Sequence, residues 1–211
     1  MEKNIEIRSY AEAPTLNEDG RTIEGYAIVF GVRSNVMYDW EEGRKFVEVI
    51  ERSAVTEELL NGCDIRALIE HNNQRLLARS NQGRGTLQLE IDDHGLKYRF
   101  VSPNTTHGND IVEMVKRGDI SGSSFAFRSS HESVKWEKEV TGLWLRTIKK
   151  LDYIRDVTMT ADPAYSQTDV TVRSIADLEI PETPEVPEEK QEVRNDESYK
   201  IQLELLKRKF N

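Results

Sequence analysis

Short apolar runs separated by turn signals recur along residues 1–174, and this pattern limits the chain to a fold rich in strands. In residues 3–10, Ile5 and Ile7 alternate with charged residues, which is the period of a half-buried strand. Asp92-Asp93-His94-Gly95 stands between two apolar runs and indicates a hairpin. In all, strands are predicted at 3–10, 21–30, 45–50, 64–70, 85–90, 96–101, 124–128, 133–136, 143–149, 151–159 and 169–174.

Two or three helices are expected among these strands, and two of them have clear end signals. Ser53 is predicted to cap a helix that runs to about Leu60, and Thr105 or Thr106 to cap a second one that runs to about Lys116. Gly25 suggests a bulge or bend in its strand, and residues 31–43 suggest a polar loop. Antiparallel strands with inserted helices predict a mainly β (α+β) domain over residues 1–174, built as a closed or partly closed antiparallel β-barrel.

The composition changes after Ser174. Residues 175–199 hold nine acidic residues, two basic residues and three of the six prolines, which is typical of a disordered linker. Residues 200–211 carry a net charge of +3, with Leu203, Leu206 and Phe210 on one helical face. This segment is predicted to be either a basic amphipathic helix that docks on a partner or a frayed tail without a role.

The overall charge and the cysteine count narrow the function classes. A net charge of -9 and a pI of about 5.1 argue against nucleic acid as the main partner, since phosphate binding needs a basic face. No apolar run approaches the roughly 20 residues that span a bilayer, and residues 1–6 lack the apolar core of a signal peptide. Cys63 is the only cysteine and is predicted to be a small buried hydrophobe. No metal-ligand or phosphate-loop pattern is present, so no cofactor and no metal are expected.

Residues 117–128 combine two glycines and three serines with an apolar run, so they predict either a turn or a strand that presents a nucleophile. A serine hydroxyl needs a base within hydrogen-bond reach, and the base needs an orienting acceptor. His71 ends an apolar strand where a polar loop is expected, so it is a candidate base or a structural histidine. His94 and His107 are predicted to lie at the surface, and His131 follows the serine-bearing strand closely.

Asp156 is the candidate orienting acid, because it lies within the strand predicted at 151–159. The alternative is that its carboxylate faces solvent or pairs with Arg155 or Arg173.

A series of motifs follows in order over about residues 20–174. It consists of Ile23-Glu24-Gly25-Tyr26-Ala27-Ile28-Val29-Phe30, His71-Asn72 leading into Leu76-Leu77-Ala78-Arg79, Gly85-Thr86-Leu87, Asp92-Asp93-His94-Gly95-Leu96, Lys116-Arg117-Gly118-Asp119-Ile120, Ser121-Gly122-Ser123-Ser124-Phe125-Ala126-Phe127, and Asp156-Val157-Thr158 through Asp162-Pro163-Ala164-Tyr165. Taken together and in order, these motifs resemble the caudoviral prohead serine protease family, the maturation proteases of tailed bacteriophages.

The resemblance implies a barrel of the herpesvirus-assemblin-like type and a serine endopeptidase with Ser124 as nucleophile, His71 as base and Asp156 as third member. Ala78 and Ala126 stand where the family often has glycine, and Ser123 where a larger apolar residue is common. Neighbours on a strand point to opposite faces, so only one of Ser123 and Ser124 can face His71, and which of them attacks stays open.

The implied substrates are the scaffold protein and extensions of the major capsid protein, cleaved inside the assembling prohead in the host bacterial cytoplasm. Self-cleavage in the acidic linker is expected, with the terminal helix recruiting the chain to scaffold, and whether the chain is a homo-oligomer stays open. Backbone amides near the glycine turn, together with Arg128 or another arginine, are the expected oxyanion donors.

Two alternatives remain. One is a non-catalytic assembly module that keeps the same barrel and binds scaffold or capsid protein through the tail. The other is an unrelated esterase, although the chain lacks the Gly-x-Ser-x-Gly elbow of the usual hydrolases.

Overall fold

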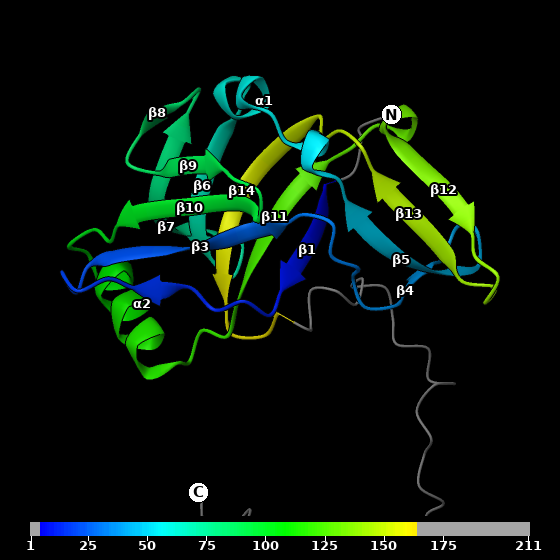
Figure 1. The fold of residues 1–211 in the computed structure, drawn as a ribbon. Helices are drawn as coiled ribbons and strands as arrows, with labels where there is room; N and C mark the ends of the chain where they lie inside the picture. Colours follow the sequence, from blue (N-terminus) through cyan, green and yellow to red (C-terminus); the bar gives the residue numbers. More distant parts are fainter. Residues whose placement is uncertain (1–4, 164–211) are drawn as a thin grey trace, which may run out of the picture. The chain divides into compact units, whose positions relative to one another are not determined.

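The computed structural model describes residues 5–163, so the predicted strand at 169–174, linker at 175–199 and helix at 200–211 lie outside the described residues. Within 5–163 the chain is mainly β, with two α-helices and two short 3-10 helices (Figure 1). The strands are β1 Glu6–Tyr10, β2 Thr15–Leu16, β3 Thr22–Val29, β4 Met37–Asp39, β5 Arg44–Ile50, β6 Asp64–Ile69, β7 Asn72–Asn81, β8 Arg84–Gly85, β9 Gln88–Ile91, β10 Gly95–Val101, β11 Gly122–Arg128, β12 Val134–Lys138, β13 Trp144–Ile148 and β14 Tyr153–Thr160. The helices are α1 Glu57–Gly62 and α2 Thr106–Arg117, and the 3-10 helices are η1 Arg52–Ala54 and η2 His131–Ser133.

The described strands pair into three sheets, ordered β1-β11-β14-β6-β7-β8, β2-β3-β10-β9 and β12-β13-β5-β4. None of these sheets closes on itself within residues 5–163, so the predicted barrel is not confirmed. Two pairs also depart from the antiparallel expectation, because β14 runs parallel to β6 and β13 runs parallel to β5. Long stretches of chain separate the members of each parallel pair, as parallel pairing requires, and local alternation does not reveal strand direction.

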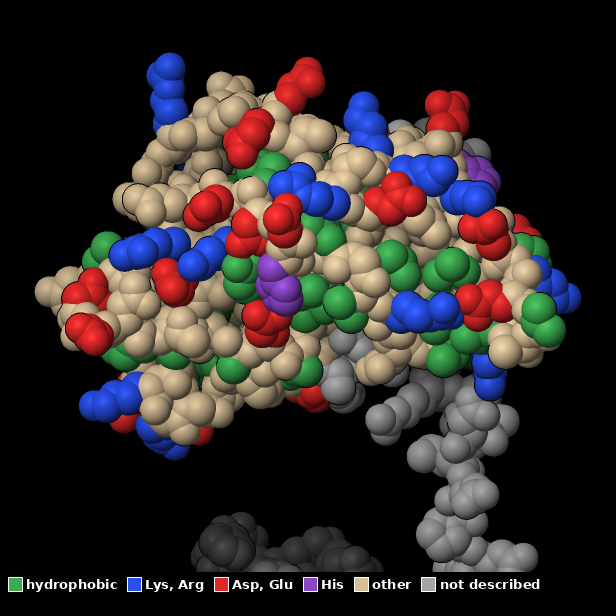
Figure 2. Space-filling model, viewed as in Figure 1, with side chains coloured by type: hydrophobic (Ala, Val, Ile, Leu, Met, Phe, Trp, Pro, Cys, Tyr) green, Lys and Arg blue, Asp and Glu red, His purple; other side chains and the backbone are tan. Residues whose placement is uncertain are grey.

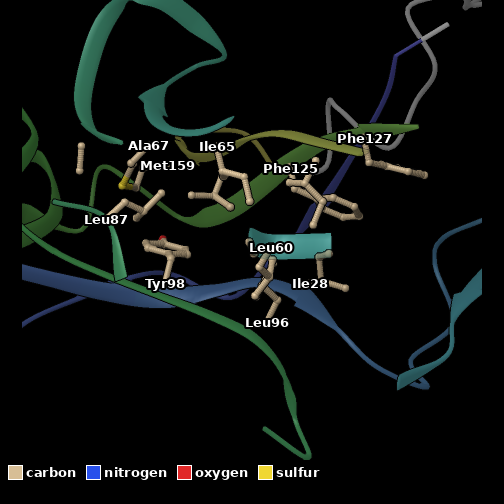
Figure 3. Packing of buried hydrophobic residues seen from close by; sticks show 14 of the residues in the cluster. Ile28, Leu60, Ile65, Ala67, Leu87, Leu96, Tyr98, Phe125, Phe127 and Met159 are labelled. Carbon is tan, nitrogen blue, oxygen red and sulfur yellow. The ribbon is translucent and has the colours of Figure 1, made fainter. Parts of the chain in front are cut away.

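The core lies between the six-stranded sheet and the sheet of β3 and β10. Figure 3 shows Tyr98, Leu96 and Ile28 on one side, facing Phe125 and Ile65 on the other. All five side chains are fully buried. Because strand side chains alternate, the residues between these apolar positions point to the opposite face of the six-stranded sheet.

Most predicted elements are confirmed, with local corrections. The cap of α1 is Thr56, whose Oγ1 accepts from the Leu59 amide, whereas Ser53 lies in η1. Thr105 caps α2, and Gly118 ends that helix in the left-handed conformation at a φ of 78°. Cys63 is buried in the core, as predicted.

Three strands were not predicted from the sequence, and the single strand predicted at 85–90 is divided between β8 and β9. β4 lies inside the predicted polar loop, β2 precedes β3, and β7 begins directly after His71. β7 was not predicted because its first five residues are polar or exposed, so they lack the alternation that indicates a strand.

Gly25 also has a different role from the one expected. The extra residue of β3 lies between Tyr26 and Ile28, whereas a Cβ at Gly25 would approach the Tyr98 hydroxyl to 2.7 Å. Gly25 therefore makes room for a core tyrosine and forms no bulge.

The surface of the described part carries charges of both signs. In Figure 2, Lys and Arg side chains are interspersed with Asp and Glu over the face shown. Neither helix between residues 5 and 163 is long and apolar enough to cross a membrane.

A buried ion network holds β1 against the sheet of β5 and β13. Arg8 donates to Glu48 from Nε at 2.8 Å and to Glu6 from Nη2 at 2.9 Å, and Arg146 donates to the same two carboxylates. Only 3% of the Glu48 side chain is exposed. Burial opposes ionisation of Glu6, but Arg146 and Arg8 outweigh it and hold the pKa of that carboxyl below its ordinary value.

Glu48→Ala is expected to destabilise the protein by roughly 3–5 kcal/mol, because it removes the buried carboxylate between Arg8 and Arg146 and leaves their two positive charges facing the single carboxylate of Glu6. Glu139→Ala is the control, since it breaks only the exposed pair with Arg33 and should cost less than about 1 kcal/mol. The free energy of unfolding in urea measures both. Equal losses in the two variants would contradict the structural role of the network.

Candidate active site

Three adjacent strands bring the candidate residues together. In the six-stranded sheet β11, β14 and β6 are neighbours, and Ser124 pairs with Thr158, which in turn pairs with Leu68. Ser124, Asp156 and Thr158 all lie on the face of this sheet that points away from the core. His71 follows β6 by two residues, so it stands at the end of the strand next to β14.

His71 is presented by a strained two-residue turn. Ile69 pairs with Asn72, so Glu70 and His71 alone connect β6 to β7, and their φ angles are 51° and 52°. Positive φ at both central positions belongs to a type I′ turn, which usually takes Asn-Gly. Backbone strain of this kind clusters at functional sites, where the surrounding structure holds it in place.

The turn is anchored through the side chain of Glu70. Its carboxylate accepts from Thr160 Oγ1 at 2.9 Å and from the Ala161 amide at 2.7 Å. The polar loop that the sequence suggested after His71 is therefore a tight hairpin.

A continuous hydrogen-bond chain joins the three candidates. His71 Nδ1 lies 2.6 Å from Asp156 Oδ1, and His71 Nε2 lies 2.6 Å from Ser124 Oγ. An ionised carboxylate only accepts, so Nδ1 carries a proton, and in the neutral imidazole Nε2 is then the acceptor. The Ser124 hydroxyl consequently donates to His71, which is the arrangement that activates a serine.

The Ser124 hydroxyl has a second acceptor within reach. Its Oγ lies 2.9 Å from the main-chain oxygen of Arg8, on the neighbouring strand β1. When His71 is protonated, Nε2 donates to Ser124 and the single hydroxyl proton turns to the Arg8 oxygen. Both protonation states of His71 thus leave Ser124 fully hydrogen-bonded.

Burial separates the acid from solvent. Asp156 has no exposed surface, whereas 16% of the His71 side chain is exposed. Burial by itself would raise the pKa of the Asp156 carboxyl, but hydrogen bonds and positive charge from His71 and Arg155 outweigh it and hold that pKa below its ordinary value. Asp156 therefore stays ionised beside His71.

The pairing of Asp156 with Arg155, weighed as an alternative from the sequence, occurs together with the bond to His71. Arg155 Nε donates to Asp156 Oδ2 at 2.8 Å. Consecutive strand residues normally face opposite ways, but Ala126 pairs with Asp156 and Phe127 with Ile154, so Arg155 is the extra residue of a β-bulge. A bulge redirects the side chain, and here it turns Arg155 toward Asp156. Arg173 lies outside the described residues.

The two adjacent serines face opposite sides of β11. Ser123 Oγ lies 2.8 Å from the hydroxyl of Tyr98, in the core, while Ser124 faces His71. The geometry thus brings Ser124, and not Ser123, to the imidazole.

The other candidates lie apart from this cluster. His94 is half exposed and contacts Glu12, and His107 is half exposed beside Asp110 at the start of α2. His131 is exposed in η2.

Arg128 lies at the far end of β11, with its guanidinium 4.7 Å from the ring centre of Tyr153. The oxyanion donors accordingly stay a prediction. A large separation between Ser124 and His71 would have favoured the non-catalytic alternative. The two side chains instead lie 2.6 Å apart, so the geometry does not favour that alternative.

The chain is similar to one protein family and to a solved structure. A family model described as caudovirus prohead serine protease matches residues 3–180, a range that contains Ser124, His71 and Asp156. No curated protein matches the chain. Among solved structures, the capsid assembly protease gp21 of bacteriophage T4 is similar, with 10% identity, 75% of this chain and 99% of that chain covered, and a TM-score of 0.45.

Proposed function

This chain belongs to the caudovirus prohead serine protease family, and we propose that Ser124, His71 and Asp156 are the catalytic residues of its peptide-bond hydrolysis. His71 Nε2 takes the Ser124 proton as Oγ attacks the peptide carbonyl carbon. The same nitrogen then protonates the leaving amine, and water hydrolyses the acyl-enzyme by the reverse sequence of proton transfers. Asp156 keeps the proton on Nδ1 and stabilises the imidazolium that forms.

One observation carries this proposal: the unbroken chain of contacts from Asp156 through His71 to Ser124, with 2.6 Å at both steps. A histidine fixed at both nitrogens needs no reorientation when it accepts the proton, so the geometry for attack exists before substrate binds. Because Ser124 has no exposed surface in this conformation, a peptide carbonyl reaches Oγ only after neighbouring groups move.

The proposed substrates are the scaffold protein and the major capsid protein of the same phage, cleaved inside the assembling prohead. Family membership supports this assignment. The herpesvirus-assemblin-like barrel belongs to the same proposal, and the packing of two sheets about one core is compatible with it.

The test is incubation of purified scaffold protein and major capsid protein with the wild-type chain, followed by mass spectrometry of new termini. Wild type and His94→Ala protein should produce the same fragments, because His94 lies in an exposed turn away from Ser124. His71→Ala protein should produce none. If His71→Ala protein cleaved the substrates as well as the wild-type protein does, His71 would be excluded as the base. If the wild-type protein left both substrates intact, the substrate assignment would be excluded.

Self-cleavage after residue 174 is part of the same proposal, supported by the acidic, proline-containing composition of residues 175–199. The intact mass of wild-type and Ser124→Ala chains, followed over time with scaffold present, distinguishes the outcomes. Shortening of the wild-type chain alone is expected. A wild-type chain that stays intact to Asn211 after scaffold has been cleaved would contradict self-removal.

A further inference from the structure

Two side chains outside the proposed triad hold the carboxylate of Asp156. Thr158 lies two residues further along β14, so its side chain is on the same face as Asp156. Thr158 Oγ1 donates to Oδ1 of Asp156 at 2.9 Å, and Arg155 Nε donates to Oδ2 at 2.8 Å. Since Oδ1 also accepts from His71, both carboxylate oxygens have fixed donors.

These donors matter because rotating the carboxylate of an aspartate about χ2 costs little energy. Rotation about χ2 has broad minima, so a carboxylate held only by His71 could offer either oxygen or turn out of the imidazole plane. Thr158 also lies 3.3 Å from His71 Nδ1, so its hydroxyl touches both partners of the Asp–His hydrogen bond. It is therefore placed to set the angle at which that bond forms.

Burial makes Thr158 harder to replace than Arg155. Thr158 has no exposed surface, so water cannot enter to supply a lost donor. The Arg155 side chain is 28% exposed, so water can substitute for part of its role. Among the described side chains that donate to the Asp156 carboxylate, Thr158 is therefore the one that is both neutral and fully buried.

We propose that Thr158 is a positioning residue of this active site, which holds the Asp156 carboxylate in the orientation that His71 requires. The inference rests on the proposed catalytic roles, since it acts only through Asp156 and His71. Thr158 makes no step of the reaction itself.

Thr158→Val tests the role, because valine keeps the branched shape and removes only the hydroxyl. With a peptide that spans a cleavage site mapped in the scaffold protein, kcat should fall about 10- to 100-fold, the size expected for one hydrogen bond to a charged group. KM should stay near wild type, because Thr158 has no exposed surface that a bound peptide could contact. Thr158→Ser restores the hydroxyl and should recover most of kcat.

The chain offers a matched control. Thr22, the first residue of β3, is also a buried strand threonine, and its hydroxyl donates to the carboxylate of Asp19 in the turn before that strand. Thr22→Val removes the same hydroxyl from a buried strand threonine outside the site and should leave kcat unchanged. If Thr158→Val did not fold, Thr158→Ala and Thr158→Ser would give the same comparison, and equal kcat in those two would overturn the proposal.

A double-mutant cycle separates positioning from a general structural effect. In an Asp156→Ala background, Thr158→Val should lower kcat no further, because the group that it positions is gone. An undiminished loss in that background, or a wild-type kcat in Thr158→Val, overturns the proposal. Inactive Ser124→Ala together with fully active Thr158→Val would reject the positioning role alone, whereas active Ser124→Ala would reject the proposed triad and this role with it.

Discussion

Ser124→Ala protein is expected to lose about 10⁴-fold or more of the wild-type kcat on a scaffold-derived peptide. The substitution removes the Oγ that lies 2.6 Å from His71 Nε2, and no other hydroxyl of β11 faces that nitrogen. The remaining activity would come from substrate binding and oxyanion stabilisation alone. The loss of kcat is measured from steady-state cleavage rates. Wild-type protein diluted to the detection limit serves as the reference.

Ser123→Ala is the matched control, because it changes the same residue type one position away. Its Oγ contacts the Tyr98 hydroxyl at 2.8 Å on the core side of β11. The variant should keep a kcat close to wild type and lose about 1–3 kcal/mol of stability, since a buried phenol loses its partner. The reverse result, with Ser123→Ala inactive and Ser124→Ala active, would assign the attack to Ser123.

Asp156→Asn is expected to lower kcat by about 10⁴-fold, the loss that the same exchange causes in other Ser-His-Asp triads. An asparagine has one acceptor oxygen, while Arg155, Thr158 and His71 all donate to Asp156. If the oxygen faces Arg155, the amide NH₂ faces His71, whose Nδ1 must then accept. The proton moves to Nε2, and His71 can no longer take one from Ser124.

Asp64→Asn provides the comparison for this substitution. Asp64 lies on β6 in the same sheet and also pairs with arginines, Arg66 and Arg79, but its carboxylate contacts no histidine. Its variant should keep the wild-type kcat. A kcat for Asp156→Asn that matches Asp64→Asn would show that Asp156 does not act through His71.

The sequence predicted most strands because each run has an apolar period and a turn residue at its end. It predicted the residues of the site through the order of motifs, with His71 at a strand end and Asp156 in a late strand. These features are local, or they depend on spacing along the chain, so a single sequence contains them.

Features that depend on strand partners were not predictable. The parallel pairing of β14 with β6 brings Asp156 beside His71, although 85 positions separate the two residues. The bulge that turns Arg155 toward Asp156 exists only in the register between β11 and β14. The choice between Ser123 and Ser124 required knowing which face of β11 meets Tyr98, and alternation alone cannot supply that.

Labelling with a small fluorophosphonate tests most directly whether His71 activates Ser124. The reagent forms a covalent bond with an activated serine oxygen, so it reports the nucleophile without any assumption about the natural substrate. Peptide mapping by mass spectrometry should place one label on Ser124 in wild-type protein and none in His71→Ala protein. A label on Ser123 or another residue, or equal labelling of Ser124 in His71→Ala protein, would contradict this activation.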